Sequence, residues 1–219
     1  MKRTVLIVLA LLAAAMPLKA QYYFATQSGA QASFRIYDNK GNIKGSYEET
    51  LKSLSGESLE NGVAILEQVY FDKEGKHILK DKSSNLTISI QGGEVTANIE
   101  TIKKGMTTQD FMIKGCVLYF PPDIGAGDHL PDRIVSVKVG RIGGNIRLSE
   151  RKVLGMENVT VPAGTFQAAK VQEKQKTRVS IISEEVTIVS WIVKEVGCVR
   201  QEVYDNKGAL VQTIEMVKR

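Results

Sequence analysis

The sequence predicts an all-β protein built on one large, strongly curved antiparallel sheet, wound as a meander, a half-barrel or an open-barrel-like structure. Three observations lead to this prediction. Turn sequences of the form Asp-x-x-Gly recur between β-prone runs, apolar and polar residues alternate along several of these runs, and a helical period is weak throughout residues 21–219.

The Asp-x-x-Gly turn is present in three copies. The pentapeptide YDNKG stands at residues 37–41 and again at 204–208, and the related FDKEG stands at residues 71–75. A β-prone run enters and leaves each copy. The Asp side chain can accept a hydrogen bond from a downstream backbone N–H, and the Gly tolerates the positive φ that a tight turn needs. A repeated cation or phosphate site is the alternative, but a calcium loop needs carboxylates at alternate positions, which these copies lack. We therefore interpret the copies as hairpin turns.

The remaining strands follow in order along the chain. Residues Tyr47–Leu59 form the best helix candidate, yet Gly56 interrupts the period and a turn-like Glu60-Asn61-Gly62 ends it, so we expect a strand followed by a loop, with a short helix as the alternative. Asn85–Ile90 and Glu94–Ile99 alternate on either side of Gln91-Gly92-Gly93, which predicts a hairpin. Further strands are expected at Phe111–Phe120, Arg133–Val139, Asn145–Leu148 and Leu210–Val217.

Two further turns complete the sheet of about a dozen strands. Gly140–Gly144 is rich in glycine, and we interpret it as a hairpin turn because no helix follows to make a phosphate cradle. The long run Thr177–Val193 is interrupted by Ser183-Glu184-Glu185, which predicts two strands with a turn at those three residues.

Residues 1–20 have the features of a secretory signal peptide. Lys2 and Arg3 supply a positive start, and Val5–Met16 form an apolar run that is too short to span a bilayer. Leu18-Lys19-Ala20 resembles a cleavage box. We predict cleavage near Ala20, followed by a single β-rich domain over residues 21–219 that is periplasmic or extracellular.

The charge balance excludes one class of partner. The whole chain has a net charge of +5, but residues 1–20 contain Lys2, Arg3 and Lys19, so the exported part holds 26 basic and 24 acidic residues, a net charge of +2. No basic cluster is interleaved with aromatic residues, so we expect no nucleic-acid partner. No run after residue 20 is long and apolar enough to predict a transmembrane segment.

The two cysteines, Cys116 and Cys198, leave their pairing open. Export would permit a disulfide between them. Two buried thiols that act as small apolar residues are the alternative.

Catalytic and cofactor motifs are not found in this sequence. His77 and His129 stand in different segments, and the chain has no G-x-S-x-G nucleophile turn, no H-x-x-x-H or C-x-x-C zinc spacing, no P-loop and no dinucleotide fingerprint. Cysteine catalysis would need a Cys–His pair, but Cys116 lies in a strand-like run where a structural role is favoured. We expect no catalytic residue, no cofactor and no metal.

The segment Pro121–Asp132 is the first candidate ligand site. Its acidic residues Asp123, Asp128 and Asp132 could meet around a ligand or cation together with His129. Three prolines and two glycines in the same segment favour an ordered loop that leaves a strand.

The second half of the chain resembles a known family. Residues 127–132 read GDHLPD, residues 159–171 read VTVPAGTFQAAKV, and VGCVRQEVYDNKG at residues 196–208 follows Trp191. In this order, from Val117 to the C-terminus, the motifs resemble the exported domain-of-unknown-function family that carries the label TapB-like. The resemblance implies a curved antiparallel sheet in the Gram-negative envelope and no established activity. In that family a Cys often follows the Thr-Phe pair, where this chain has Gln167-Ala168-Ala169, so no family disulfide is carried over.

Within these motifs, V-P-A-G-T-F favours a structural corner. Pro162 fixes φ, Gly164 allows a sharp bend, and Phe166 returns the chain to the core. A loop that contacts a ligand through Pro162 and Phe166 is the alternative.

Together these features predict an exported, non-catalytic cell-envelope protein. One hypothesis is that a concave face of the sheet binds a lipid or another apolar small molecule. The alternative is an assembly protein that binds an envelope protein through a sheet edge or an exposed loop. An enzyme would need Asp128, His129 and Cys116 to converge in a cleft.

Overall fold

The computed structural model describes residues 27–58, 61–78, 84–91, 94–103, 111–121, 123–139, 141–179 and 181–219, and within them it contains strands and no helix. The strands are β1 (Gln31–Asp38), β2 (Ile43–Ser58), β3 (Asn61–Asp72), β4 (Ser84–Gln91), β5 (Glu94–Lys103), β6 (Phe111–Phe120), β7 (His129–Leu130), β8 (Arg133–Val139), β9 (Ile142–Val161), β10 (Gly164–Val179), β11 (Ile182–Val193), β12 (Gly197–Tyr204) and β13 (Leu210–Lys218). None of the described residues forms a helix long and apolar enough to cross a membrane.

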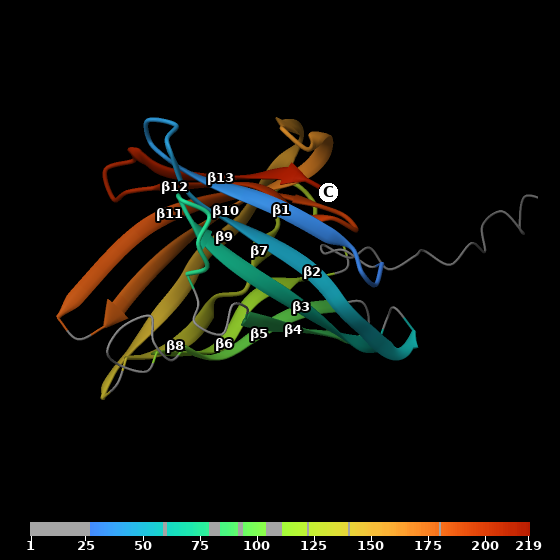
Figure 1. Ribbon diagram of the computed structural model, residues 1–219, viewed down its shortest axis with the longest axis horizontal. Helices are drawn as coiled ribbons and strands as arrows, with labels where there is room; N and C mark the ends of the chain where they lie inside the picture. Colours follow the sequence, from blue (N-terminus) through green and yellow to red (C-terminus); the bar gives the residue numbers. More distant parts are fainter. Residues whose placement is uncertain are drawn as a thin grey trace, which may run out of the picture.

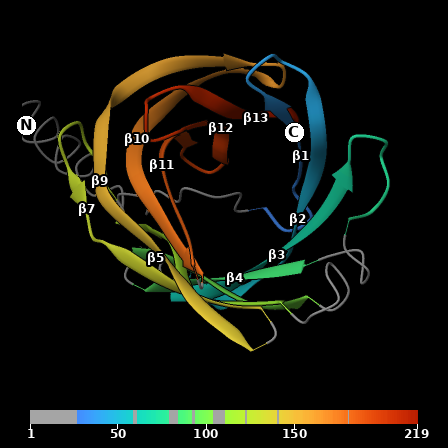
Figure 2. The same ribbon diagram turned by 90° about the vertical axis from the view of Figure 1, so that its left-hand side faces the viewer.

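All thirteen strands belong to one sheet, in the order β10-β11-β12-β13-β1-β2-β3-β4-β5-β6-β8-β9-β7. Every pairing in it is antiparallel. The first strand of this order, β10, also pairs with β9, the strand before the last, so the sheet curls round on itself (Figures 1 and 2). The predicted fold class, an all-β protein with one large, strongly curved antiparallel sheet, is confirmed.

The three Asp-x-x-Gly segments form turns of one geometry, as predicted. Each Asp carboxylate accepts hydrogen bonds from the backbone N–H groups two and four residues ahead, and each Gly has a φ of about 80°. Asp38 accepts from Lys40 and Asn42 at 2.9 Å, Asp72 accepts from Glu74 at 2.9 Å and Lys76 at 2.8 Å, and Asp205 accepts from Lys207 at 2.9 Å and Ala209 at 2.8 Å. The φ angles are 79° at Gly41, 80° at Gly75 and 81° at Gly208.

Several sequence-based boundaries are wrong. The turn expected at Gly140–Gly144 is shorter, because Ile142, Gly143 and Gly144 already pair with β8, and the strand expected at Asn145–Leu148 is part of β9, which continues to Val161. The strand expected to give way to a loop within Tyr47–Leu59 continues to Ser58, because Gly56 has a φ of 147° and lies against the partner strand without ending the ladder. The turn expected at Ser183-Glu184-Glu185 lies earlier, between Val179 and Ile182, and those three residues pair with β10. The strand tolerates them because they are exposed and Glu185 forms a 3.0 Å ion pair with Lys176 across the ladder.

Among the described residues, buried apolar side chains form three clusters. One joins β2, β3 and β4 through Leu51, Ala64, Leu66, Ile88 and Ile90. A second joins the β6–β7 connection to the sheet and includes Phe120, Ile124, Leu130, Val153 and Ile192. The largest links β9, β10 and β11 to β1, β12 and β13, and includes Phe34, Val159, Val161, Ala168, Val189, Trp191, Val199 and Met216.

The β9–β10 hairpin bends, and this bend positions the site described below. Its register shifts twice opposite Lys170–Lys174, and Glu150 adopts a positive φ of 52°, as at the bulges that curve β-strands. The distal half then packs over β11–β13, where the Ala163 N–H donates to the Met216 carbonyl at 3.2 Å.

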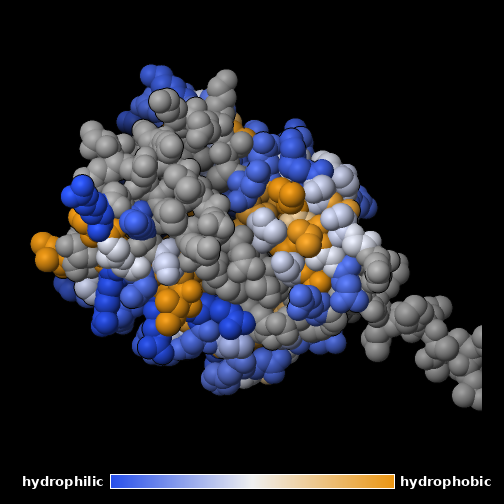
Figure 3. Space-filling view, turned by 90° about the horizontal axis from the view of Figure 1, so that it is seen from below, coloured by the Kyte–Doolittle hydropathy of each residue, from blue (hydrophilic) through white to orange (hydrophobic). Residues whose placement is uncertain are grey.

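Exposed hydrophobic side chains are dispersed on the face seen in Figure 3, where they form small separate patches among hydrophilic residues. Leu154 and Met156, both on β9, are 43% and 45% exposed. They stand at the start of the bent half of the hairpin.

Candidate functional site

The bend of the β9–β10 hairpin creates a groove of about 710 Å³ over β11 and β12. Its lining comes from the bent hairpin, from one face of β11 and β12, and from the turn that follows β12. The lining residues are Leu154, Glu157, Asn158, Val159, Thr160, Lys170, Gln172, Thr187, Val189, Trp191, Arg200, Glu202, Tyr204 and Gly208.

Strand alternation determines which side chains reach this groove. Successive side chains of a strand point to opposite faces of the sheet. Arg200, Glu202 and Tyr204 therefore share the groove face of β12, whereas Gln201 points to the other face, where its Nε2 donates to Ser190 Oγ at 3.2 Å. Trp191 is directly opposite Arg200 in the ladder.

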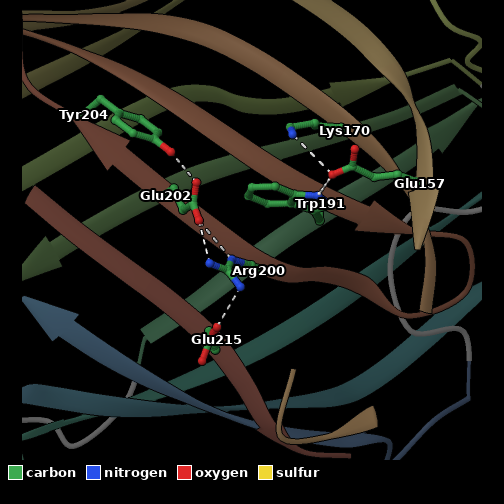
Figure 4. A network of polar contacts seen from close by, with 7 residues as sticks. All are labelled: Glu157, Lys170, Trp191, Arg200, Glu202, Tyr204 and Glu215. Carbon is green, nitrogen blue, oxygen red and sulfur yellow. Dashed lines mark hydrogen bonds and ion pairs between the residues drawn. The ribbon is translucent and has the colours of Figure 1, made fainter. Parts of the chain in front are cut away.

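Trp191 is the only tryptophan of the chain. Its indole contacts one carboxylate and two cationic side chains. Its Nε1 donates to Glu157 Oε1 at 2.6 Å, and Lys170 Nζ lies 3.2 Å from the same oxygen (Figure 4). The Lys170 ammonium is 5.0 Å and the Arg200 guanidinium 5.4 Å from the indole ring centroid, within the range of cation–π attraction. The hydrogen bond from Trp191, followed by the contact with Lys170, lowers the pKa of Glu157.

A second group of ion pairs continues from Arg200 across β12 and β13 (Figure 4). The Arg200 Nε and Nη2 donate to Glu202 Oε1 at 3.1 and 2.6 Å, and Nη1 lies 3.1 Å from Glu215 Oε1. Tyr204 donates its hydroxyl hydrogen to the other oxygen of Glu202. That hydrogen bond, together with partial burial, raises the pKa of Tyr204.

The charges of this groove are satisfied by one another. Lys170 and Arg200 are each paired with carboxylates, and Glu157 and Glu202 each accept hydrogen bonds from two side chains. A charged ligand would have to displace one of these pairs. The lining residues that remain available to contact a ligand are apolar or neutral. Examples are Val189, Gln172, Asn158 and Thr187.

Sequence reasoning missed this groove. The single tryptophan and the alternating Arg200-x-Glu202-x-Tyr204 were visible, but they were considered only as parts of a family motif. Glu157 and Lys170 could not be added from the sequence, because the hairpin bend alone brings them to Trp191.

The four candidate residues of the loop after β6 lie elsewhere. Asp123, Asp128, His129 and Asp132 are all exposed. Asp128 Oδ2 accepts from the Gly125 N–H at 2.7 Å and so closes the loop on itself, and Asp132 forms a 2.8 Å ion pair with Arg147. His129 is paired with β9. Within the described part of the chain, no three acidic, His or Cys residues stand close enough together to hold a metal.

The candidate corner lies at the tip of the β9–β10 hairpin. Pro162 and Ala163 form a two-residue loop between Val161 and Gly164, and Gly164 has a φ of 139°. Phe166 packs against the largest core cluster, as the structural interpretation requires. Pro162 and Phe166 are not among the groove-lining residues that the structure describes.

Cys198 is a free thiol in this structure. It lies close to the Arg200 carbonyl, with Sγ at 3.2 Å, and burial raises its pKa to about 12. The side chain of Cys116 lies outside the described residues, so a disulfide between the two stays a prediction. The predicted signal peptide also lies outside them.

A second, smaller cavity of about 140 Å³ is lined by Leu51, Leu66, Leu86, Ile88, Glu49 and Cys198, among others. Because β2–β4 and β12 are not neighbours in the sheet order, a cavity lined by both lies inside the curl. Burial raises the pKa of the Glu49 carboxyl, although its Oε1 accepts a hydrogen bond from Gln68 Nε2 at 2.7 Å.

Comparison with known proteins identifies a family and a fold. The family model described as DUF3108-like matches residues 27–216. A crystal structure of a candidate exported protein with a YmcC-like fold from Bacteroides fragilis is 17% identical, with a TM-score of 0.73, over 90% of this chain and 98% of that one. A candidate lipoprotein from Parabacteroides distasonis is 20% identical, with a TM-score of 0.74, over 91% and 99%. No functionally curated protein matches the chain.

These likenesses show the fold. The matching family model confirms a family of unknown function, as predicted, whereas its description is not the predicted label TapB-like, which stays a prediction.

Proposed function

The chain belongs to the DUF3108-like family, and on this premise we propose that it is an exported, non-catalytic protein of the cell envelope that binds a ligand in the groove over β11 and β12. The signal-peptide features of residues 1–20 support export. The likeness to structures described as a candidate exported protein and a candidate lipoprotein is consistent with a location in the cell envelope.

The observation that carries the proposal is the groove itself. Its volume of about 710 Å³ falls within the range of about 300 to 1,000 Å³ that is usual for ligand sites. Its floor is fixed in place by the ion pairs around Trp191 and Arg200, so little ordering is needed when a ligand binds.

The same ion pairs support a non-catalytic role. A general acid or base needs a carboxyl group that is free to exchange its proton near neutral pH. Hydrogen bonds lower the pKa of Glu157, and both oxygens of Glu202 are occupied by Arg200 and Tyr204. The geometry suits recognition better than proton transfer.

The inner cavity favours a second candidate function, the binding of a small apolar molecule inside the curl. At about 140 Å³, it is close to the cavity of about 150 Å³ that accepts benzene in an engineered protein. Such a volume suits a small apolar group better than a whole lipid. The wall formed by Leu51, Leu66 and Ile88 and the carboxyl of Glu49 would favour an apolar group with one hydrogen-bonding atom.

The test is native mass spectrometry on the exported chain purified gently from its own envelope, before and after denaturation. Thr187→Phe fills the groove, and Thr87→Phe adds the same ring at an exposed position of β4 that does not line the groove. We expect a bound mass in the wild type and in the Thr87→Phe variant, and its loss in Thr187→Phe.

If the bound mass is still present in Thr187→Phe, the binding site is the inner cavity and not the groove. A bare chain in all three samples would count against a stably bound ligand.

A further inference from the structure

In the described part of the chain, β9 has an unpaired outer edge along the groove. Residues 155–161 pair with β10 on one side. On the other side, the ladders of β9 with β8 and β7 end at Leu148 and Lys152, and Val153 bonds to the loop at Gly127 and Asp128. Among the residues that the structure describes, no strand pairs with the outer side of 154–161.

The hairpin geometry identifies the backbone groups on this edge. In a two-residue hairpin the residues that flank the loop, here Val161 and Gly164, exchange the first ladder hydrogen bonds, and bonded residues then alternate along the strand. The backbone N–H and C=O groups of Thr160, Asn158 and Met156 therefore point away from β10. From Met156 to Thr160 the edge is about 13 Å long.

This edge forms one wall of the groove. Asn158 and Thr160 line it together with Trp191 on β11 and Tyr204 on β12. An added strand could thus bond the edge of β9 while its side chains contact the floor formed by β11 and β12.

The sequence of this edge lacks the residue types that usually protect against pairing. Exposed edges are normally blocked by lysine, proline, charge or a covering segment. Residues 154–161 contain no Lys, Arg or Pro, and their single charge, on Glu157, is bonded to Trp191 and Lys170. The exposed side chains of Leu154 and Met156 add apolar surface beside it.

From these observations we infer that the groove takes an extended, uncharged segment of another polypeptide, which adds as a strand to the edge of β9 between Met156 and Thr160. The inference rests on the proposed function and specifies its ligand. Backbone donors and acceptors that point away from β10 at strand spacing match another strand, and the paired charges of Lys170 and Arg200 favour a segment without charge.

The test uses an octapeptide selected from a phage-displayed library on the immobilised exported chain, then synthesised. Binding is followed through the fluorescence of Trp191, the only tryptophan. Two further peptides carry N-methyl groups on alternate residues, one on the odd and one on the even positions, which removes opposite sets of backbone donors.

We expect one methylated set to weaken binding at least tenfold, because two or more backbone hydrogen bonds are lost. The other set should bind within about twofold of the parent peptide, because its N–H groups point away from β9. Thr187→Phe should abolish binding, Thr87→Phe should retain it, and the amides of Asn158 and Thr160 should exchange more slowly in the complex.

Equal effects of the two methylated sets, or a library without binders, would overturn the inference. So would a homodimer of this chain in which the same amides become protected. A bound mass identified as a non-polypeptide in the mass-spectrometry test would also overturn it, yet the proposed function would stand. Persistence of that mass in Thr187→Phe would instead overturn the groove as the site.

Discussion

The buried ion pair between Arg151 and Glu173 predicts an asymmetric response to mutation. The Arg151 side chain is 2% exposed and that of Glu173 is 17% exposed, and Arg151 Nε donates to Glu173 Oε2 at 2.8 Å. Arg151 Nη1 also donates to the Pro131 carbonyl at 3.2 Å and so ties the loop before β8 to β9.

Glu173→Gln leaves the guanidinium buried without its counter-charge. Breaking a buried pair in this way costs about 3 to 5 kcal/mol, and we expect about 3 kcal/mol here because the Glu173 end is partly hydrated. Arg151→Met removes the buried charge itself and leaves a carboxylate that water can reach, so we expect a loss of only about 1 to 2 kcal/mol.

Urea unfolding of the exported chain at pH 7, followed by Trp191 fluorescence and circular dichroism, measures both variants. For a domain of this size, about 3 kcal/mol corresponds to a decrease in Tm of roughly 6 to 12 °C. The double variant should lie near Arg151→Met, since it contains no unpaired buried charge. A cost for Glu173→Gln that is equal to or smaller than that of Arg151→Met would refute the reasoning.

Three further predictions concern the sheet and its interior. Gly144→Ala should cost more than about 2 kcal/mol in urea unfolding, because its Cβ would lie 2.1 Å from a carbonyl oxygen of β10. A Cβ at the neighbouring Gly143 would meet nothing within 4 Å, so Gly143→Ala should cost less than about 1 kcal/mol. Equal costs of the two variants would contradict this packing. The raised pKa of Glu49 means that the folded state holds its proton more tightly than the unfolded state. Its contribution to stability should therefore fall as pH rises above about 4.3, the unfolded value, and Glu49→Gln should flatten that part of the stability-versus-pH profile. Because the pKa of Cys198 is raised to about 12, its thiol should react slowly with a disulfide reagent at pH 8 in the folded protein. In denaturant, two reactive thiols would show that Cys116 and Cys198 are reduced, and none would show that they are bridged.

Local chemistry in the sequence was enough to predict the turns and most strands. Asp38 and Gly41 form their turn through contacts within five residues, so the pentapeptide contains the information for it. The limits of β6 and β8 agree with their apolar runs for the same reason. The turn near Ser183 was misplaced because cross-strand pairing with Lys176, and not local polarity, decides where β11 begins.

The sequence by itself therefore determined an all-β chain, its hairpin turns and the alternation of its faces, because each depends on neighbours along the chain. Only the tertiary structure decided that β9 and β10 close the sheet and that their hairpin bends over β11–β13. The hydrogen bond from Trp191 to Glu157 joins residues 34 positions apart. Such a contact depends on ladder register, bulges and the curl of the whole sheet, which no local pattern encodes.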